Sequence, residues 1–316
     1  MKQVRWGVLG VAKIAVNQVI PAILEAPNSE LYAIASRDGE KAAAAAERFG
    51  CKAVQGYEHL LADEQVDAVY IPLPNGMHME WTIAAANAGK HVLCEKPLGL
   101  NVAECERMIA ACEQNNVLLM EAFMYRYSEK TKKTLEIIQS GKLGKLAHIS
   151  SSFRFLLTDP NDICFYPDGG GSLYDVGCYP VNFINMIVPA DPVEIHVVRS
   201  DKYGVDLSLA ALLKYEDGLT ATIHTGFNSV ETLRNEICGT DGALFVHRPF
   251  FGEADEMLLV TESGEQRIPV EACNPYLRQV TGFAEAVLNG GPLQMPLADT
   301  IRNMRLIDRL YALSKQ

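Results

Sequence analysis

The sequence predicts an α/β protein with two domains: a doubly wound parallel sheet, then an α+β domain with an open, mostly antiparallel sheet. In the first third of the chain, short apolar runs alternate with helical segments. A glycine turn follows the first predicted strand, and beyond about residue 121 the strands lengthen and alternate every second residue. We therefore expect a dinucleotide-binding Rossmann domain over residues 1–121, and a domain for substrate binding and oligomerisation over residues 122–316.

The strands expected in the first domain are continuous apolar runs, as is typical when helices cover both faces of a sheet. After the first strand, residues 3–10, a helix over residues 13–26 contains Pro21, which should kink or restart it. Asp38 should cap the helix after the second strand, and Gly50 should end it. Further strands are expected at 51–55, 66–73, 91–95 and 117–123, and helices at 57–62, 77–88 and 102–114.

The second domain begins with an amphipathic helix over residues 128–140 and continues with strands of period-two alternation. Hairpin signals, Glu-Asp-Gly at residues 216–218 and Ser-Gly at residues 263–264, predict antiparallel pairs. Helices covering one face of this sheet are expected near residues 172–188, 276–288 and 298–314.

Composition and charge narrow the class of partner. The chain is 48% hydrophobic and 21% charged, and its net charge of -11 argues against nucleic acid and anionic membranes as partners. No apolar run reaches the roughly 18 residues that a spanning helix needs, and no leader is visible, so we expect a cytoplasmic protein. The eight cysteines lack CxxC spacing, which predicts reduced, mostly buried thiols and no metal site.

The glycine turn GVLGVAKIA lies where a dinucleotide fold binds the pyrophosphate, at the N-terminus of a helix. Gly10 is the turn glycine, while Ala12 and Ala15 take the second and third positions of G-x-G-x-x-G. A tight turn without a ligand is the alternative, but four further β-α units favour binding. Cofactor contacts are expected here from Gly7, Gly10, Ala12, Lys13 and Ile14.

The end of the second strand, Ser36-Arg37-Asp38, bears on which cofactor is bound. An NAD site places Asp or Glu on the ribose hydroxyls here, and Ser36 occupies that position. Arg37 could form a fork with a 2′-phosphate, which favours NADP. NAD stays possible because of Asp38, unless Asp38 merely caps a helix and Arg37 is solvated.

Lys96, in the stretch HVLCEKPLGL, directly follows an apolar strand and precedes a proline. In an open α/β sheet the ligand lies outside the carboxyl ends of the strands, and residues 72–78 follow a second such strand. Lys96 is therefore expected beside the nicotinamide and the substrate. Without the glycine turn, a surface charge at a strand end would be the better interpretation.

The stretch GGGSLYDVGCYPVN is the second informative one. If Ser172 caps a helix, Asp175 and Tyr179 share a face, and Gly177 between them suits close packing or ligand approach. Pro180 indicates an irregular or late helix start. A tyrosine whose pKa is lowered by an ammonium could exchange a proton with an alcohol. Packing for the tyrosine and capping for the acid are the alternative.

GVLGVAKIA, SRD, YIPLPNGMHMEW, GKHVLCEKPL, MEAFMYRY and GGGSLYDVGCYPVN together resemble the glucose-fructose oxidoreductase and inositol dehydrogenase (Gfo/Idh/MocA) family. The likeness covers nearly the whole chain, and EKP with its flanks is its most specific element. GCYP resembles the branch with dimeric dihydrodiol dehydrogenase and NADP-dependent D-xylose 1-dehydrogenase. The resemblance implies a Rossmann domain, an open-sheet domain and a nicotinamide cofactor.

By motif, the resemblance implies that Lys96 is the catalytic lysine, Asp175 an orienting acid and Tyr179 the acid/base. Relatives outside this branch commonly have D-x-x-x-H, so Tyr179 replaces a histidine, which leaves inositol dehydrogenation in doubt. Whether Lys96 or Tyr179 finally carries the proton stays open. Further cofactor contacts are expected from Ser36, Arg37, Pro72, Asn75, His78, Glu95 and Lys96. Substrate contacts are expected from Arg126, Tyr127, Phe153 and Phe155, for which core packing is equally open.

The sequence thus predicts an NADP-preferring dehydrogenase acting on CH–OH groups of a polyol, sugar or cyclic diol, without a metal. A homodimer or homotetramer through the second sheet is expected. An NAD-dependent glycosidase of the same fold and a cofactor-binding sensor without turnover are the alternatives. The presence of both Lys96 and Tyr179 argues against the sensor.

Overall fold

The computed structural model describes residues 2–315, which form two compact units. The first unit contains the chain up to Met124 together with Tyr276–Ile301. The second contains Tyr125–Pro275 and the chain from Arg302 onward. The segment 276–301 thus returns to the first unit, so the helix predicted over residues 276–288 packs there and not on the second sheet.

The sheet of the first unit has six strands, all parallel, in the order β3-β2-β1-β4-β5-β6. This order is that of a dinucleotide-binding fold, so the predicted doubly wound sheet is confirmed. The strands are β1 (Val4–Leu9), β2 (Ser29–Ser36), β3 (Lys52–Gln55), β4 (Ala68–Ile71), β5 (His91–Glu95) and β6 (Leu119–Ala122).

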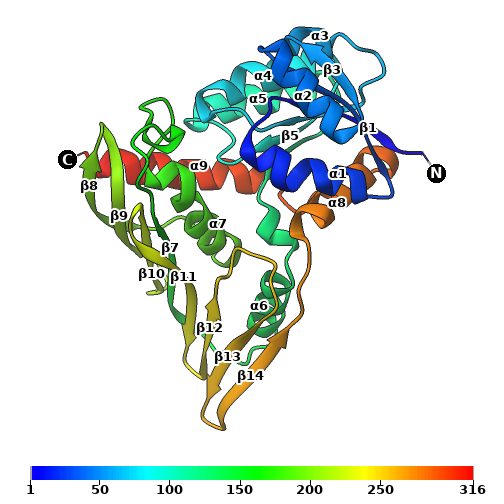
Figure 1. Cartoon of the computed structure of the whole chain (residues 1–316). Helices are drawn as coiled ribbons and strands as arrows, with labels where there is room; N and C mark the ends of the chain where they lie inside the picture. Colours follow the sequence, from blue (N-terminus) through cyan, green and yellow to red (C-terminus); the bar gives the residue numbers. More distant parts are fainter. Residues whose placement is uncertain (1, 316) are drawn as a thin grey trace. The chain divides into compact units, whose positions relative to one another are not determined.

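Helices cover both faces of this sheet (Figure 1). Trp6 and Gly7 are neighbours in β1 and therefore point to opposite faces. The Trp6 ring lies 5.5 Å from that of Phe283, whereas a Cβ on Gly7 would come within 2.5 Å of Leu60 Cδ2. The helices are η1 (Ala15–Val19), α1 (Ile20–Glu25), α2 (Gly39–Phe49), α3 (Tyr57–Leu61), η2 (Asn75–Met77), α4 (His78–Asn87), α5 (Val102–Gln114) and α8 (Pro275–Asn289).

The local signals at the helix ends act as predicted. Asp38 caps α2, because its carboxylate accepts hydrogen bonds from two backbone N–H groups of the first turn. Gly50 ends α2 with a φ of 69°, in the left-handed region that favours glycine. Pro21 lies at the start of α1, directly after the π-helical turn η1, and the chain stays helical through both, so the irregularity is a π-helical turn and not a restart.

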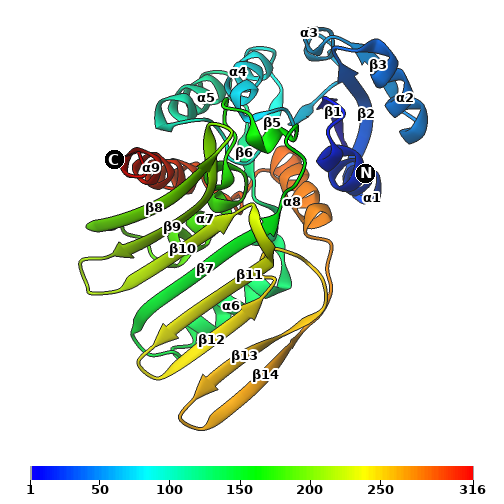
Figure 2. The same cartoon turned by 60° about the vertical axis from the view of Figure 1, so that its left-hand side comes forward.

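The second unit is built on an eight-stranded sheet in the order β14-β13-β12-β11-β7-β10-β9-β8, which Figure 2 shows strand by strand. Only β7 and β10 pair in parallel, so the predicted open, mostly antiparallel sheet is confirmed. Gly218 and Gly264, both at positive φ, lie at the two predicted hairpins. The strands are β7 (Leu146–Leu156), β8 (Glu194–Lys202), β9 (Val205–Lys214), β10 (Thr220–Gly226), β11 (Asn228–Gly239), β12 (Gly242–His247), β13 (Asp255–Thr261) and β14 (Gly264–Val270).

One face of this sheet packs on helices and the other is open. Ile149, Ile223 and Leu213 are buried on the covered face, where α7 packs against β7 and β10. On the open face Val198 keeps 75% of its surface exposed. The other helical elements are η3 (Met124–Tyr127), α6 (Glu129–Gln139), η4 (Ile163–Phe165), η5 (Leu173–Gly177), α7 (Cys178–Ile187) and α9 (Leu297–Leu313).

Two predictions from the sequence concern the state of the cysteines and the presence of a membrane-spanning helix. The eight cysteines carry free thiols, four of them buried and four half-buried. Between residues 2 and 315 no helix combines the length and apolarity needed to cross a membrane.

Candidate active site

The glycine turn connects β1 to the first helical residues. Gly10 has a φ of 113° and its N–H donates to Ala35 O at 2.8 Å, which fixes the turn against β2. A helix begins at Lys13, so its first N–H groups form an anion site of the kind that binds a pyrophosphate. Gly7 lies within β1, where its missing side chain leaves room for Leu60. The cofactor contact expected of Gly7 stays a prediction.

At the end of β2, the structure separates the roles of Ser36, Arg37 and Asp38. Ser36 is buried, and its hydroxyl accepts the Asp38 N–H at 3.2 Å. The Asp38 carboxylate is occupied as a helix cap, accepting Glu40 N at 3.0 Å and Lys41 N at 3.2 Å. Asp38 therefore has the capping role that was one of its two interpretations, and Arg37 is the exposed cation beside it.

Arg37 lines a hollow of about 500 Å³ in the first unit. Burial raises the pKa of Tyr57, while the charge of Arg37 and a hydrogen bond with it lower this pKa, so the guanidinium lies beside the Tyr57 hydroxyl. The Tyr57 and Trp81 rings pack edge to face, 4.8 Å apart at 83°. A cation beside the Tyr57 hydroxyl in this hollow suits a phosphorylated ribose, so these residues fit NADP. The other lining residues are Gln55, Gly56, Glu58 and His59.

The loop that carries Lys96 is held by buried side chains of the first unit. His78 is fully buried, and its Nδ1 lies 3.0 Å from Pro97 O. Glu121, also buried, accepts the Leu98 N–H at 2.9 Å. The Nε2 of His78 lies 2.8 Å from Leu73 O, so both ring nitrogens face backbone carbonyl oxygens. Burial lowers the pKa of His78, and these carbonyl oxygens oppose this shift. Lys96 therefore projects from a fixed loop at the carboxyl end of β5.

Glu95, half-buried at the end of β5, lies among ionisable groups. Its Oε1 accepts the Tyr70 hydroxyl at 2.7 Å, and its Oε2 lies 3.3 Å from the Lys96 N–H. Burial and then the Glu95 charge raise the pKa of Tyr276, whereas the charge of Lys96 lowers it. Tyr276 of α8 thus lies in the field of both residues. We did not single it out in the sequence, because it lies far from the EKP motif along the chain.

In the second unit, Tyr179 lies in the first turn of α7 within a cluster of aromatic rings. Only 8% of its surface is exposed. Its ring centroid lies 5.3 Å from that of Phe250, 5.4 Å from Phe153 and 5.9 Å from Tyr125. Phe250 follows β12 in a loop without periodicity, so no sequence signal indicated it.

Asp175 lies in the π-helical turn η5, directly before α7, and accepts a hydrogen bond from the Cys164 thiol at 3.4 Å. The irregular helix start indicated by Pro180 is confirmed by this turn. Gly177 serves close packing, since a Cβ there would lie 3.1 Å from Leu173 and 3.2 Å from Thr225.

The sequence left open whether Ser172 caps a helix, and its side chain does not do so. The Ser172 backbone is already helical, with φ −66° and ψ −29°, and its side chain makes no cap bond. Its hydroxyl donates to Asp206 instead, at 2.7 Å.

Arg126, one of the predicted substrate residues, contacts a buried amide, that of Asn182. Arg126 is 8% exposed, and its Nε donates to Asn182 Oδ1 at 3.0 Å. The Tyr125 hydroxyl donates to the same oxygen. Asn182 was missed in the sequence, although its spacing of three residues from Tyr179 on one helix could have indicated it.

The structure groups the predicted residues within each unit. In the first unit, the carboxyl ends of β1, β2, β4 and β5 bring together Gly10, Ala12, Lys13, Ile14, Ser36, Arg37, Pro72, Asn75, His78, Glu95 and Lys96. In the second unit, Asp175, Tyr179, Arg126 and Phe153 belong to the surroundings of α7, while Phe155 packs beside Phe153 and Tyr127 is half-buried at the end of η3.

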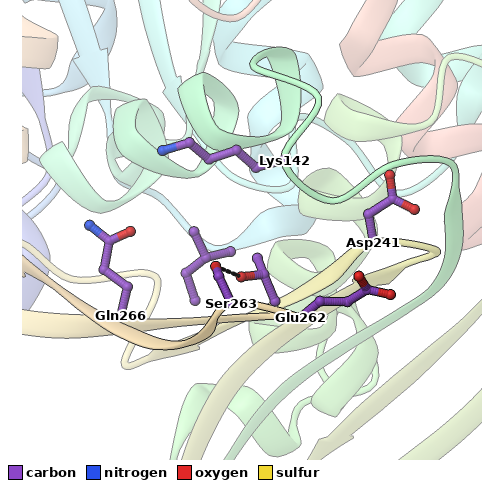
Figure 3. Close-up of a pocket in the computed structure, with 7 residues that line it drawn as sticks. Lys142, Asp241, Glu262, Ser263 and Gln266 are labelled. Atoms are coloured by element: carbon purple, nitrogen blue, oxygen red, sulfur yellow. Dashed lines mark hydrogen bonds between the residues drawn. The ribbon is translucent and has the colours of Figure 1, made fainter.

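A second hollow, of about 630 Å³, lies elsewhere in the second unit (Figure 3). Lys142, Asp241, Glu262 and Gln266 line it with exposed side chains of mixed charge. Thr261 and Ser263 are hydrogen-bonded to one another at 2.7 Å. None of the predicted site residues lines it. In the described part of the chain, no three His, Cys, Asp or Glu side chains group in a way that could hold a metal ion.

Comparison with known proteins identifies the family and supports the fold. Residues 4–123 match the oxidoreductase family with an NAD-binding Rossmann fold, and residues 131–245 match the GFO/IDH/MocA C-terminal domain. The chain is 39% identical to D-xylose 1-dehydrogenase (NADP(+)) 2 of Haloferax volcanii, over 97% of this chain and 96% of that protein. It is 30% identical to trans-1,2-dihydrobenzene-1,2-diol dehydrogenase of Xenopus tropicalis, over 76% of this chain and 74% of that one.

A solved 3-ketoreductase from Actinomadura kijaniata, in complex with NADP and TDP-benzene, superposes with a TM-score of 0.93. It shares 32% identity, and the match covers 98% of each chain. These relatives include both enzymes of the branch that the GCYP motif indicated, and the NADP complexes agree with the expected cofactor. The chain therefore belongs to the GFO/IDH/MocA oxidoreductase family.

Proposed function

We propose that this protein is an NADP-preferring dehydrogenase that acts on a CH–OH group of a sugar or cyclic diol. The observation that carries the proposal is Lys96, a cation on a fixed loop at the carboxyl end of β5, where this type of sheet binds its ligand. Family membership supports oxidoreductase chemistry. When bound, the nicotinamide would supply hydride exchange with the carbinol carbon.

The cofactor preference rests on the end of β2. Asp38 is occupied as the cap of α2, and Arg37 faces a hollow with aromatic walls. A guanidinium can hold a 2′-phosphate in a fork, whereas an NAD site would offer a carboxylate to the ribose. The relative from Haloferax volcanii is named as an NADP(+) enzyme, and the solved ketoreductase binds NADP.

In the proposed chemistry Tyr179 accepts the alcohol proton during oxidation and returns it during reduction. A free phenol has a pKa of about 10, so an ammonium must favour the phenolate for this exchange to run near neutrality. Lys96 supplies that charge, and Asp175 orients the arrangement. Solved variants of the Actinomadura ketoreductase replace one lysine and one tyrosine, whose spacing is within one residue of that between Lys96 and Tyr179.

The rings near Tyr179 support the proposed substrate class. Phe153 and Phe155 are half-buried with centroids 6.5 Å apart, and Phe153 stacks on Phe250 at 5.6 Å. Aromatic faces suit the apolar CH face of a ring that carries hydroxyl groups at its edge. Buried Arg126 could donate hydrogen bonds to such hydroxyls.

One assay separates this proposal from its two alternatives. Purified protein is mixed with NADP or NAD and a panel of aldoses, cyclic diols and aryl glycosides, and both NADPH absorbance and released aryl alcohol are followed. Net reduction of NADP by an aldose or diol supports a dehydrogenase. Glycoside cleavage without net cofactor reduction would indicate the glycosidase, and tight NADP binding without any turnover would indicate the sensor.

We also propose that the protein self-associates through the open face of the second sheet. Three large apolar side chains lie exposed on this face: Leu156 at 59%, Val198 at 75% and Leu212 at 44%. Light scattering after gel filtration should give the mass of a dimer or tetramer, and Val198→Lys should shift it toward the monomer. A monomer for the unaltered protein at high concentration would reject this part.

A further inference from the structure

A buried carboxylate lies at the start of the helical segment that carries Asp175 and Tyr179. Asp206, in β9, is only 1% exposed. Its Oδ2 accepts hydrogen bonds from the Ser172 hydroxyl and from the Leu173 N–H, both at 2.7 Å. The first turn of this helical segment is therefore fixed from the sheet and not by a residue of its own.

The chain just before this turn is fitted closely to the same carboxylate. Gly171 has a φ of 100°, which favours glycine, and a Cβ there would lie 2.1 Å from Asp206 Oδ1. On the neighbouring strand β10, the Thr225 hydroxyl donates to Ser172 O at 2.8 Å. Two adjacent strands thus hold Gly171 and Ser172 in one conformation.

This arrangement has an energetic cost that a simple helix cap avoids. Burial raises the pKa of Asp206, and the two hydrogen bonds and the charge of Arg199 only partly oppose this shift. A serine or asparagine at the N-cap would satisfy an N–H group of the first turn without burying a carboxylate. In exchange for this cost, the hydrogen bonds from Ser172 and Leu173 to Asp206 link η5 and α7 rigidly to the sheet.

We propose that Asp206 is a positioning residue, which sets the orientation of the helical segment that presents Asp175 and Tyr179. It acts through the Ser172 hydroxyl and the Leu173 N–H, and it contacts neither substrate nor cofactor. This inference rests on the proposed function, because it takes Tyr179 as the proton-transfer group. A shift of about 1 Å in such a group typically costs about 10² in rate.

Three variants of the full chain test this role. Asp206→Ala removes both acceptors, and we expect kcat to fall by about 10² while the Michaelis constant for NADP changes little. Asp206→Asn keeps an oxygen that can accept both hydrogen bonds, so kcat should stay within about threefold of the unaltered protein. Asp67→Ala is the matched control for Asp206→Ala, because it removes a carboxylate contact to Arg5 in the first unit and should lower stability without changing kcat.

A readout besides activity separates this inference from the proposed function. Hydrogen exchange of the peptide spanning residues 171–179 should be faster in Asp206→Ala and unchanged in Asp206→Asn. Tyr179→Phe, measured in parallel, tests the proposed function alone, and its full activity would reject the role of Tyr179 without altering the exchange result. Unchanged kcat in Asp206→Ala, measured where the variant is folded, would overturn the inference. Equal loss in Asp206→Asn and Asp206→Ala would overturn it as well.

Discussion

Replacing Arg37 by alanine should weaken NADP binding and leave NAD binding nearly unchanged. The guanidinium lies beside the Tyr57 hydroxyl and lines the hollow at the end of β2. Removing one partner of a charge-assisted hydrogen bond costs about 1.5 to 3 kcal/mol. Because Arg37 is exposed, we expect the lower part of this range, which corresponds to a loss of about tenfold in affinity for NADP.

The neighbouring carboxylate does not cancel this charge. Asp38 Oδ1 accepts two backbone N–H groups of α2, and the Asp38 carboxylate needs no contact with the Arg37 charge to cap the helix. An exposed cation is also screened by salt, so NADP affinity should fall more steeply with ionic strength than NAD affinity does. In Arg37→Ala this difference in salt dependence should disappear.

The assay is a fluorescence titration of the protein with each cofactor, at low and at physiological ionic strength. Arg48→Ala is the control, because it removes an exposed cation from the other end of α2, where it packs on Phe49. Its two affinities should match those of the unaltered protein. An equal loss of NADP and NAD affinity in Arg37→Ala, or no loss at all, would refute the reasoning.

Three further predictions concern catalysis and stability. Lys96→Met keeps much of the apolar stem and removes the charge, so kcat should fall by about 10² or more while the melting temperature stays unchanged. A near-normal kcat would show that Lys96 is only a surface charge. Burial raises the pKa of Asp255, but the hydrogen bond from Lys130 and further contacts lower it by more, so the folded-state pKa is below the usual value. The ionised Asp255 therefore stabilises the fold above about pH 4, and this stabilisation is lost as pH falls through the folded-state pKa. Asp255→Asn removes the carboxylate from the buried Lys130 ammonium, which keeps the carbonyl oxygens of His247 and Arg248 as acceptors. The free energy of unfolding in urea at pH 7 should fall by about 1.5 to 3 kcal/mol, with a smaller difference at low pH, and equal stabilities at pH 7 would contradict this. Phe250→Leu loses the ring contacts with Phe153 and Tyr179 and should cost about 1 to 2 kcal/mol of stability, whereas an unchanged urea midpoint would show that these contacts contribute nothing.

Much of the fold could be predicted because its signals are local. Asp38 and Gly50 bound α2 as the sequence indicated, and the glycines at 218 and 264 mark the two hairpins. Each of these positions depends on the conformation of a few neighbouring residues, which a short stretch of sequence specifies. The continuous apolar strands likewise indicate a sheet covered on both faces.

What could not be predicted depends on contacts between distant segments. Asp206 replaces Ser172 as the group that fixes the start of the helical segment, and it does so from a strand that follows that segment. The return of residues 276–301 to the first unit and the parallel pairing of β7 with β10 are of the same kind. Periodicity gives the type of an element and which side is apolar, but not which partner covers it.

In the candidate site, too, the residues marked by local signals could be predicted, and those placed by contacts between distant segments could not. Arg37 and Lys96 stand at strand ends that the sequence identifies, because the carboxyl ends of parallel strands meet at one edge of the sheet. Asn182, Phe250 and Tyr276 were missed. Their positions near the predicted residues arise from packing within a unit, and neither spacing nor composition marks Phe250 or Tyr276.

The most direct test of the proposed chemistry is the pH dependence of kcat for Tyr179→Phe, with NADP and the best substrate of the panel saturating. The change removes only the hydroxyl of a ring packed against Phe153 and Phe250, so fold and cofactor affinity should persist. We predict that kcat for alcohol oxidation falls by about 10² to 10⁴ and that the acidic limb of the profile, where a protonated phenol cannot accept the proton, disappears. A variant that keeps its kcat and the acidic limb, with only a raised Michaelis constant, would contradict the account and make Lys96 the proton carrier.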